Sequence, residues 1–125
     1  SAQLVALREA DLDMRYTAAL DLELDYRYDD ALRAYRAIDE SWPGQLDVRT
    51  RVQNIESSLE LAREAAAKGE KAEAGGDVEG AIAAYREALT YVPKFGDLVA
   101  RIGKLREKIK SKVAPEGTAG AAAKK

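Results

Sequence analysis

Apolar and small residues recur at spacings of three and four along most of the chain, with charged residues between them. The pattern is clearest over residues 78–91, where its positions are Ala81, Ile82, Tyr85, Ala88 and Leu89. These spacings place the side chains on one face of an α-helix. Asp77 is expected to cap the first turn of this helix, and Pro93 is expected to end it.

The same periodicity predicts an all-α chain, because no segment alternates with the period of two that a strand requires. The expected helices span residues 4–25, 29–41, 46–74, 78–91 and 96–113. On the first helix the apolar positions include Leu4, Leu7, Met14, Ala18 and Leu24. Asp29 or Asp30 is expected to cap the second helix and Asp97 the fifth, because the positive end of the helix dipole stabilises acidic side chains.

The third expected helix is long, and its apolar or small positions alternate between spacings of four and three. These positions are Val48, Val52, Ile55, Leu59, Ala62, Ala66 and Gly69. The pattern is typical of helices that cross at a shallow angle, and it predicts packing against the second and fourth helices of the same chain. A short coiled-coil contact with a second copy is the alternative.

A single domain is expected over residues 1–113, because a chain of 125 residues has the size of one domain. From Ala114 the sequence reads APEGTAGAAAKK. Such small residues bury too little surface to offset the entropy of an ordered chain. Residues 114–125 are therefore predicted to form a flexible tail or linker.

The pattern of residues 78–91 occurs a second time, 50 residues upstream. Ala31, Leu32, Tyr35, Ile38 and Pro43 stand at the offsets of Ala81, Ile82, Tyr85, Ala88 and Pro93. The correspondence continues as Asp47 with Asp97, Arg51 with Arg101, Val52 with Ile102 and Ile55 with Leu105. The chain therefore contains an internal repeat, which predicts an array of similar structural units.

Residues 62–95 resemble the tetratricopeptide repeat, a helix–turn–helix unit of about 34 residues. The resemblance is carried by Gly69, Gly76, Asp77, Ala81, Tyr85, Ala88 and Pro93. A weaker match covers residues 12–45 through Ala19, Ala31, Tyr35 and Pro43, with Ile38 and Tyr26-Arg27 departing from the family pattern. The resemblance implies antiparallel helical hairpins in an array, closed by a C-terminal capping helix.

In that family the stacked hairpins form a concave groove that binds protein segments. The resemblance implies a groove lined by Asp13, Tyr16, Leu20, Glu23, Arg63, Ala66, Glu70, Glu73 and Lys104. The family's clamp for a C-terminal carboxylate needs Lys and Asn where this chain has Tyr16, Leu20 and Ala67, so the clamp is missing. The groove is expected to bind a partner helix or extended segment with apolar anchors and basic residues.

The charge is divided unevenly along the chain, although the net charge is only −2. Residues 1–62 hold 13 acidic and 7 basic residues, a net −6, whereas residues 63–125 hold 9 acidic and 13 basic residues, a net +4. This division suits head-to-tail association, and two solvated ends are the alternative. Residues 94–112 are rich in Lys and Arg, and no aromatic residue is interleaved with the basic residues from Arg101 to Lys112. We therefore expect a solvated capping face there, with neither nucleic acid nor a membrane as partner.

The composition lacks the residues on which most catalytic and metal sites depend. There is no histidine and no cysteine, and these are the commonest general base and the strongest nucleophile. Asp21, Glu23 and Asp25 alternate, but a calcium loop would need Gly at Tyr26 and Glu at Leu32. No catalytic residue, metal ligand or cofactor is predicted.

These observations predict a non-enzymatic protein–protein interaction module, an adaptor or scaffold of a larger bacterial-type protein. The alternative is a module that assembles with copies of itself as part of a larger complex. No apolar run approaches the roughly 20 residues that a membrane span requires. The start at Ser1-Ala2 without methionine suggests a processed or excised piece. The absence of cysteine fits the cytoplasm, which we favour, and the periplasm as well.

Overall fold

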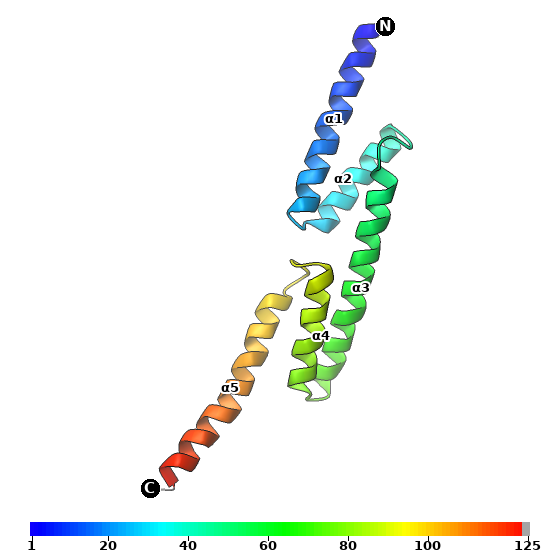
Figure 1. The fold of residues 1–125 in the computed structure, drawn as a ribbon. Helices are drawn as coiled ribbons and strands as arrows, with labels where there is room; N and C mark the ends of the chain where they lie inside the picture. The colour runs from blue at the N-terminus through cyan, green and yellow to red at the C-terminus, as the bar shows by residue number, and fades with distance from the viewer. Residues whose placement is uncertain (124–125) are drawn as a thin grey trace. The chain divides into compact units, whose positions relative to one another are not determined.

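The computed structural model describes the backbone of residues 1–123 and the side chains of residues 1–112. Over this range the chain forms five α-helices and no strand, so the predicted all-α class is confirmed (Figure 1). The helices are α1 (Ala2–Leu24), α2 (Tyr28–Ser41), α3 (Val48–Ala74), α4 (Val78–Tyr91) and α5 (Leu98–Ala123). None of the described helices is both long enough and apolar enough to cross a lipid bilayer.

The chain divides into two compact units, where its length predicts one domain. Unit 1 is Ser1–Leu61 and unit 2 is Ala62–Lys125. The boundary falls inside α3, so residues 48–61 of this helix belong to unit 1 and residues 62–74 to unit 2.

The 50-residue repeat of the sequence is confirmed in the helices and in the core. α2 and α4 begin and end at positions 50 residues apart, and so do the starts of α3 and α5. The buried residues of α2 and α4 are Ala31, Leu32, Tyr35 and Ile38 in unit 1, and Ala81, Ile82, Tyr85 and Ala88 in unit 2. The two units therefore share one plan of packing.

The turn that joins the first two helices of each unit is also repeated. Tyr26 in unit 1 and Gly76 in unit 2 both have positive φ angles, 61° and 83°. Glycine adopts this left-handed conformation at no steric cost. Tyr26 adopts it in place of glycine, so the turn keeps its geometry although the family's Gly-Asp pair is absent from unit 1.

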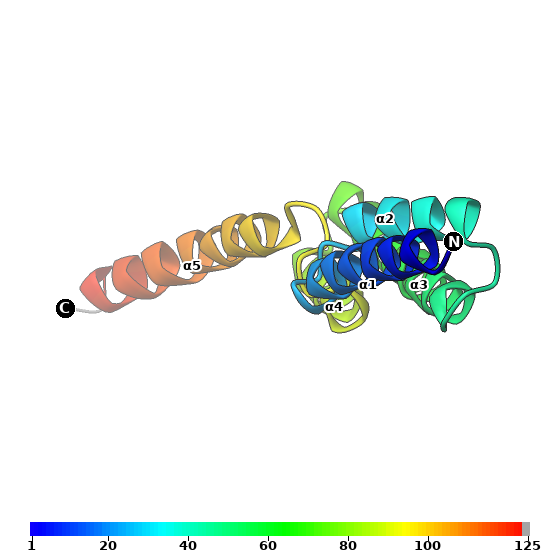
Figure 2. The ribbon, with the colours of Figure 1, turned by 90° about the horizontal axis from the view of Figure 1, so that it is seen from above.

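In unit 1, α1 and α2 lie side by side in both views (Figures 1 and 2). The core side of α1 carries Leu12 and Ala19. Leu4, Leu7, Met14 and Leu24, which are apolar positions of the first expected helix, are exposed. At about 1.5 Å per residue, the 14 residues of α2 are too short to cover the 23 residues of α1.

In unit 2, α4 packs closely against the second part of α3. A Cβ atom added to Gly69 would lie 2.4 Å from Cδ1 of Tyr85, whose side chain is fully buried. Only glycine permits this approach. The core of unit 2 is completed by Ala62, Ala65 and Ala66 of α3 and by Leu98, Ile102 and Leu105 of α5.

The helix caps agree with the sequence in unit 2 and differ from it in unit 1. The Asp77 carboxylate accepts a hydrogen bond from the Gly80 amide at 2.9 Å, which confirms the predicted cap of α4. The expected cap of α2 by Asp29 or Asp30 is wrong, because Arg27 occupies the cap position and both acids lie in the first turn. Asp30 instead accepts a hydrogen bond from the Arg27 side chain at 2.7 Å.

The ends of the helices lie within two residues of the predicted ones, except at the C-terminal end of α5. That helix continues to Ala123, whereas the sequence predicts its end near residue 113. Alanine has the highest helix propensity, and five of residues 114–123 are alanines. Residues 124 and 125 lie outside the described part, and the flexibility predicted for residues 114–125 stays a prediction.

Candidate functional site

A polar network crosses the packed helices of unit 1. The Tyr35 hydroxyl of α2 donates a hydrogen bond to Oε1 of Glu23 in α1 at 2.7 Å. Nη1 of Arg51 in α3 donates to the same oxygen at 3.1 Å. One carboxylate therefore joins all three helices of the unit, and the Tyr35 ring beneath it is fully buried.

Tyr16 of α1 extends this network along the same side of unit 1. Its hydroxyl donates a hydrogen bond to Asp47, and Nε of Arg51 donates to the Tyr16 oxygen at 3.0 Å. The Tyr16 ring lies 6.1 Å from the Tyr35 ring, and Cζ of Arg51 lies 6.0 Å from the Tyr16 ring. Tyr16 thus fills the space between α1 and the start of α3.

The environment keeps these groups in fixed charge states. Burial, and then the hydrogen bond to Glu23, raises the pKa of Tyr35, so its hydroxyl stays a donor. Burial and the hydrogen bond to Asp47 raise the pKa of Tyr16 in the same way. The hydrogen bond from Tyr16 lowers the pKa of Asp47, which stays a carboxylate. The network of unit 1 is therefore a set of hydrogen bonds in which the tyrosines are donors and the carboxylates acceptors.

Unit 2 repeats the centre of this network. The Tyr85 hydroxyl donates a hydrogen bond to Oε1 of Glu73 at 2.8 Å, and Nε of Arg101 lies 3.7 Å from the same oxygen. Nη1 of Arg101 also lies 3.8 Å from Oε1 of Glu70. Burial, followed by the contact with Glu73, raises the pKa of Tyr85 to about 12. The Arg101 guanidinium stands 5.7 Å from the centre of the Tyr85 ring.

One member of the network is missing from unit 2, because Ala66 stands at the position of Tyr16. Beside the network there is a cavity of about 310 Å³, which we call the lysine cavity. It is lined by Glu73, Asp97, Ala100, Arg101, Lys104, Leu105 and Lys108. In unit 1 the positions of the two lysines hold Asn54 and Ser58. Unit 2 thus combines a missing aromatic side chain with two added cations.

The structure brings together only part of the groove that the family resemblance implies. Tyr16 and Glu23 belong to the network of unit 1, and Leu20 is half-buried nearby on α1. Glu73 and Lys104 line the lysine cavity, and Glu70 lies beside Arg101. Asp13 and Arg63 are exposed and belong to neither the networks nor the lysine cavity.

Sequence reasoning missed several members of these sites. Asp47 and Arg51 complete the network of unit 1, and Asp97, Arg101 and Lys108 line the lysine cavity of unit 2. The signal was present, because Asp47 and Arg51 recur 50 residues later as Asp97 and Arg101. Charged residues that repeat as faithfully as core residues indicate an internal contact, whereas a solvated surface imposes no such constraint.

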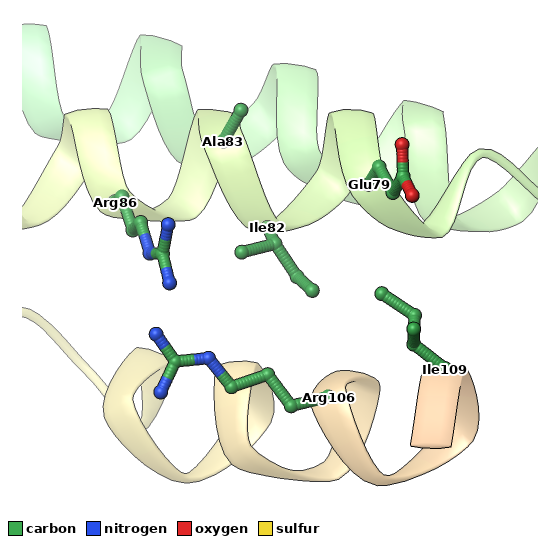
Figure 3. Close-up of a pocket in the computed structure, with 6 residues that line it drawn as sticks. All are labelled: Glu79, Ile82, Ala83, Arg86, Arg106 and Ile109. Carbon is green, nitrogen blue, oxygen red and sulfur yellow. The ribbon is translucent and has the colours of Figure 1, made fainter. Parts of the chain in front are cut away.

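A second cavity of unit 2 lies between α4 and α5 and measures about 290 Å³ (Figure 3). It is lined by Glu79, Ile82, Ala83, Arg86, Arg106 and Ile109. The guanidinium groups of Arg86 and Arg106 point toward each other from the two helices in Figure 3. We call it the arginine cavity, and it shares no residue with the lysine cavity.

No group of three or more Asp or Glu side chains within the described residues is arranged to hold a metal ion. Comparison of the chain with family models, with curated proteins and with solved structures finds no match. The resemblance to the tetratricopeptide repeat therefore rests on the quoted residues and on the internal repeat alone.

Proposed function

We propose that this chain is a non-enzymatic interaction module, a tetratricopeptide-like adaptor that binds a segment of a partner protein. The observation that carries the proposal is the lysine cavity of unit 2, which is lined by Asp97 and Arg101, the counterparts of the residues that bind Tyr16 in unit 1. We infer that the partner supplies an aromatic side chain, preferably tyrosine, to this cavity. Cavities of this size are at the lower end of those that bind small ligands, which suits one side chain.

The contacts of Tyr16 indicate how a partner's tyrosine would be held. Asp47 and Arg51, which bind the Tyr16 hydroxyl, have Asp97 and Arg101 as their counterparts in unit 2. Within the described residues, the side chain of Asp97 has no hydrogen bond or ion pair, so it is available to accept one. Aromatic anchors in such pockets contribute most of the affinity at many protein interfaces.

The charges around the cavity favour acidic side chains beside the aromatic anchor. Lys104 and Lys108 lie on its rim, and neither forms an ion pair with a described residue. Glu73 is one of the acidic groove residues for which a basic partner was expected. Its carboxylate already lies close to Arg101, which supplies the positive charge from within the chain. We therefore expect an extended partner segment in which tyrosine is flanked by aspartate or glutamate.

Selection of peptides from a random library displayed on phage, with the whole chain as target, tests this function. We expect the selected peptides to combine an aromatic residue with acidic neighbours. Ala66→Tyr restores the side chain present in unit 1, so its hydroxyl should occupy Asp97 and Arg101 in place of the partner's tyrosine and weaken binding by about tenfold or more. Fluorescence anisotropy with labelled peptides measures the affinity.

Ala18→Tyr provides a matched control, because it makes the same change at an exposed position of α1. This variant should bind the selected peptides as tightly as the original chain. Equal binding by Ala66→Tyr would remove the lysine cavity as the partner site. Failure to select any peptide would count against the adaptor function itself.

Self-assembly is the second candidate function, and an exposed apolar surface of α1 favours it. Leu4, Val5 and Leu7 are 54–62% exposed, whereas Ile55, which stands at the position of Val5 in the repeat, is 2% exposed. A second copy that covered these side chains would remove apolar surface from water.

A further inference from the structure

Two arginines face each other across the arginine cavity with no carboxylate between them. Arg86 comes from α4 and Arg106 from α5, and both guanidinium groups point into the space between the helices (Figure 3). Within the part of the chain whose side chains are described, neither arginine forms an ion pair or a side-chain hydrogen bond. Two like charges repel, weakly here because both side chains are exposed, and an anion between them would replace this repulsion by attraction.

Unit 1 has an ion pair at the same place. Arg36 and Glu56 stand 50 residues before Arg86 and Arg106. Nη2 of Arg36 lies 2.6 Å from Oε2 of Glu56, which joins α2 to α3. Unit 2 therefore keeps the arginine of the pair and replaces the carboxylate by a second arginine.

The other walls of the cavity restrict what the missing anion can be. Ile82 and Ile109 point toward each other beside the arginines and provide an apolar surface (Figure 3). Glu79 lies at the same cavity and opposes a second negative charge. A group with one negative charge on a short hydrocarbon stem meets both requirements, and a phosphate dianion meets neither.

We propose that the arginine cavity binds the carboxylate of a glutamate or aspartate side chain on an acidic segment of a partner protein. The carboxylate bridges Arg86 and Arg106, as the Glu56 carboxylate pairs with Arg36 in unit 1. The methylene groups of the same side chain pack on Ile82 and Ile109. This site is separate from the lysine cavity and does not depend on the aromatic anchor proposed there.

A labelled peptide of alternating glutamate and leucine, acetylated and amidated at its ends, is the probe. Binding to the whole chain is measured by fluorescence anisotropy, and a peptide with glutamine in place of glutamate controls for apolar contacts. Arg106→Glu restores the ion pair of unit 1, so it should lower the affinity by about tenfold or more. It should also raise Tm by roughly 2–5 °C, because repulsion is replaced by attraction.

Two control variants separate this site from its surroundings. Lys112→Glu makes the same charge change on α5 outside the cavity, and it should leave the affinity within about threefold because exposed charges act weakly. Ala66→Tyr acts on Asp97 and Arg101 of the lysine cavity and should not affect this probe. If Ala66→Tyr abolished binding of the probe while Arg106→Glu did not, the acidic segment would bind at the lysine cavity. The proposal for the arginine cavity would then fail, and the proposed function at the lysine cavity would stand.

Three results would overturn the proposal. The first is binding that does not depend on the charges at this site. The glutamate and glutamine peptides would then bind with equal affinity, or Arg106→Glu and Lys112→Glu would lower the affinity equally. The second is displacement of the peptide by inorganic phosphate but not by acetate, which would identify a phosphate site. The third is a dimer of the original chain that Arg106→Glu dissociates, because the carboxylate would then come from a second copy.

Discussion

Single residues decide whether a position in this repeat holds an internal contact or a cavity. Tyr16 completes the network of unit 1, whereas unit 2 has Ala66 at this position and the lysine cavity beside its network. Glu56 pairs with Arg36, and the corresponding Arg106 faces Arg86 across the arginine cavity. In both cases unit 1 has the contact and unit 2 does not. Unit 1 therefore shows which contact is missing from unit 2.

The pH dependence of stability tests the network at the scale of one residue. The pKa of Tyr85 is raised from about 10 to about 12, so above pH 10 the unfolded chain loses this proton before the folded one. The free energy of unfolding contributed by the hydroxyl is therefore complete below pH 10 and is lost as the pH rises toward 12. Tyr85→Phe should be less stable than the original chain by about 1–2 kcal/mol at pH 8. The difference should shrink above pH 10 in urea unfolding experiments.

Tyr91→Phe is the matched control for this experiment, because Tyr91 ends α4 without a side-chain hydrogen bond in the described network. Because this variant loses no hydroxyl hydrogen bond of the network, its free energy of unfolding at pH 8 should lie within about 0.5 kcal/mol of that of the original chain. A Tyr85→Phe difference that stayed constant between pH 8 and 11 would contradict the hydrogen-bonded state assigned to Tyr85.

At the scale of helices, the spacing between neighbours depends on one small side chain. Gly69 of α3 faces the Tyr85 ring so closely that a Cβ atom has no room. The corresponding residue of unit 1 is Ala19, which is fully buried beside α2. The close contact of α3 with α4 therefore depends on the absence of a methyl group in unit 2.

Gly69→Ala and Gly103→Ala should have opposite effects on stability. Alanine favours a helix over glycine by about 1 kcal/mol at either position. At Gly103 a Cβ atom meets nothing within 4 Å, so the variant should gain about 0.5–1 kcal/mol. At Gly69 the clash with the buried Tyr85 ring should outweigh this gain and cost a net 1–2 kcal/mol or so. Thermal unfolding followed by circular dichroism measures both, and a stabilised Gly69→Ala would refute the close contact.

The helices were predictable where the apolar period is strong and the ends carry clear signals. For α4, Asp77 and Pro93 mark both ends, and of the five positions on the predicted face four are buried and Leu89 is half-buried. α1 shows the opposite case, because its own apolar side chains lie on several faces of the helix. Periodicity alone therefore does not identify Leu12 and Ala19 as the buried residues. The cavities were not predictable from any motif. They arise from differences between repeat units, and such a difference is informative only once the contact in the reference unit is known.

At the scale of the whole molecule, the chain carries opposite charges on its two halves and exposed apolar residues on α1. Attraction between exposed charges is weak at physiological salt, where the Debye length is about 8 Å. Leu4, Val5 and Leu7 are three side chains, whereas stable interfaces use roughly 20–30 residues on each partner. Neither feature alone is sufficient for a stable dimer, which favours the adaptor over the self-assembly module.

We therefore expect a monomer of 13.6 kDa in size-exclusion chromatography with light scattering, at low and high salt and at concentrations about twentyfold apart. A dimer that dissociates as salt rises would instead support head-to-tail association through the charged halves. A dimer that persists in high salt but is lost in Leu4→Ser/Leu7→Ser would identify the exposed surface of α1 as the interface. Either dimer would move self-assembly ahead of partner binding, because the chain would then bind its own copies before a partner.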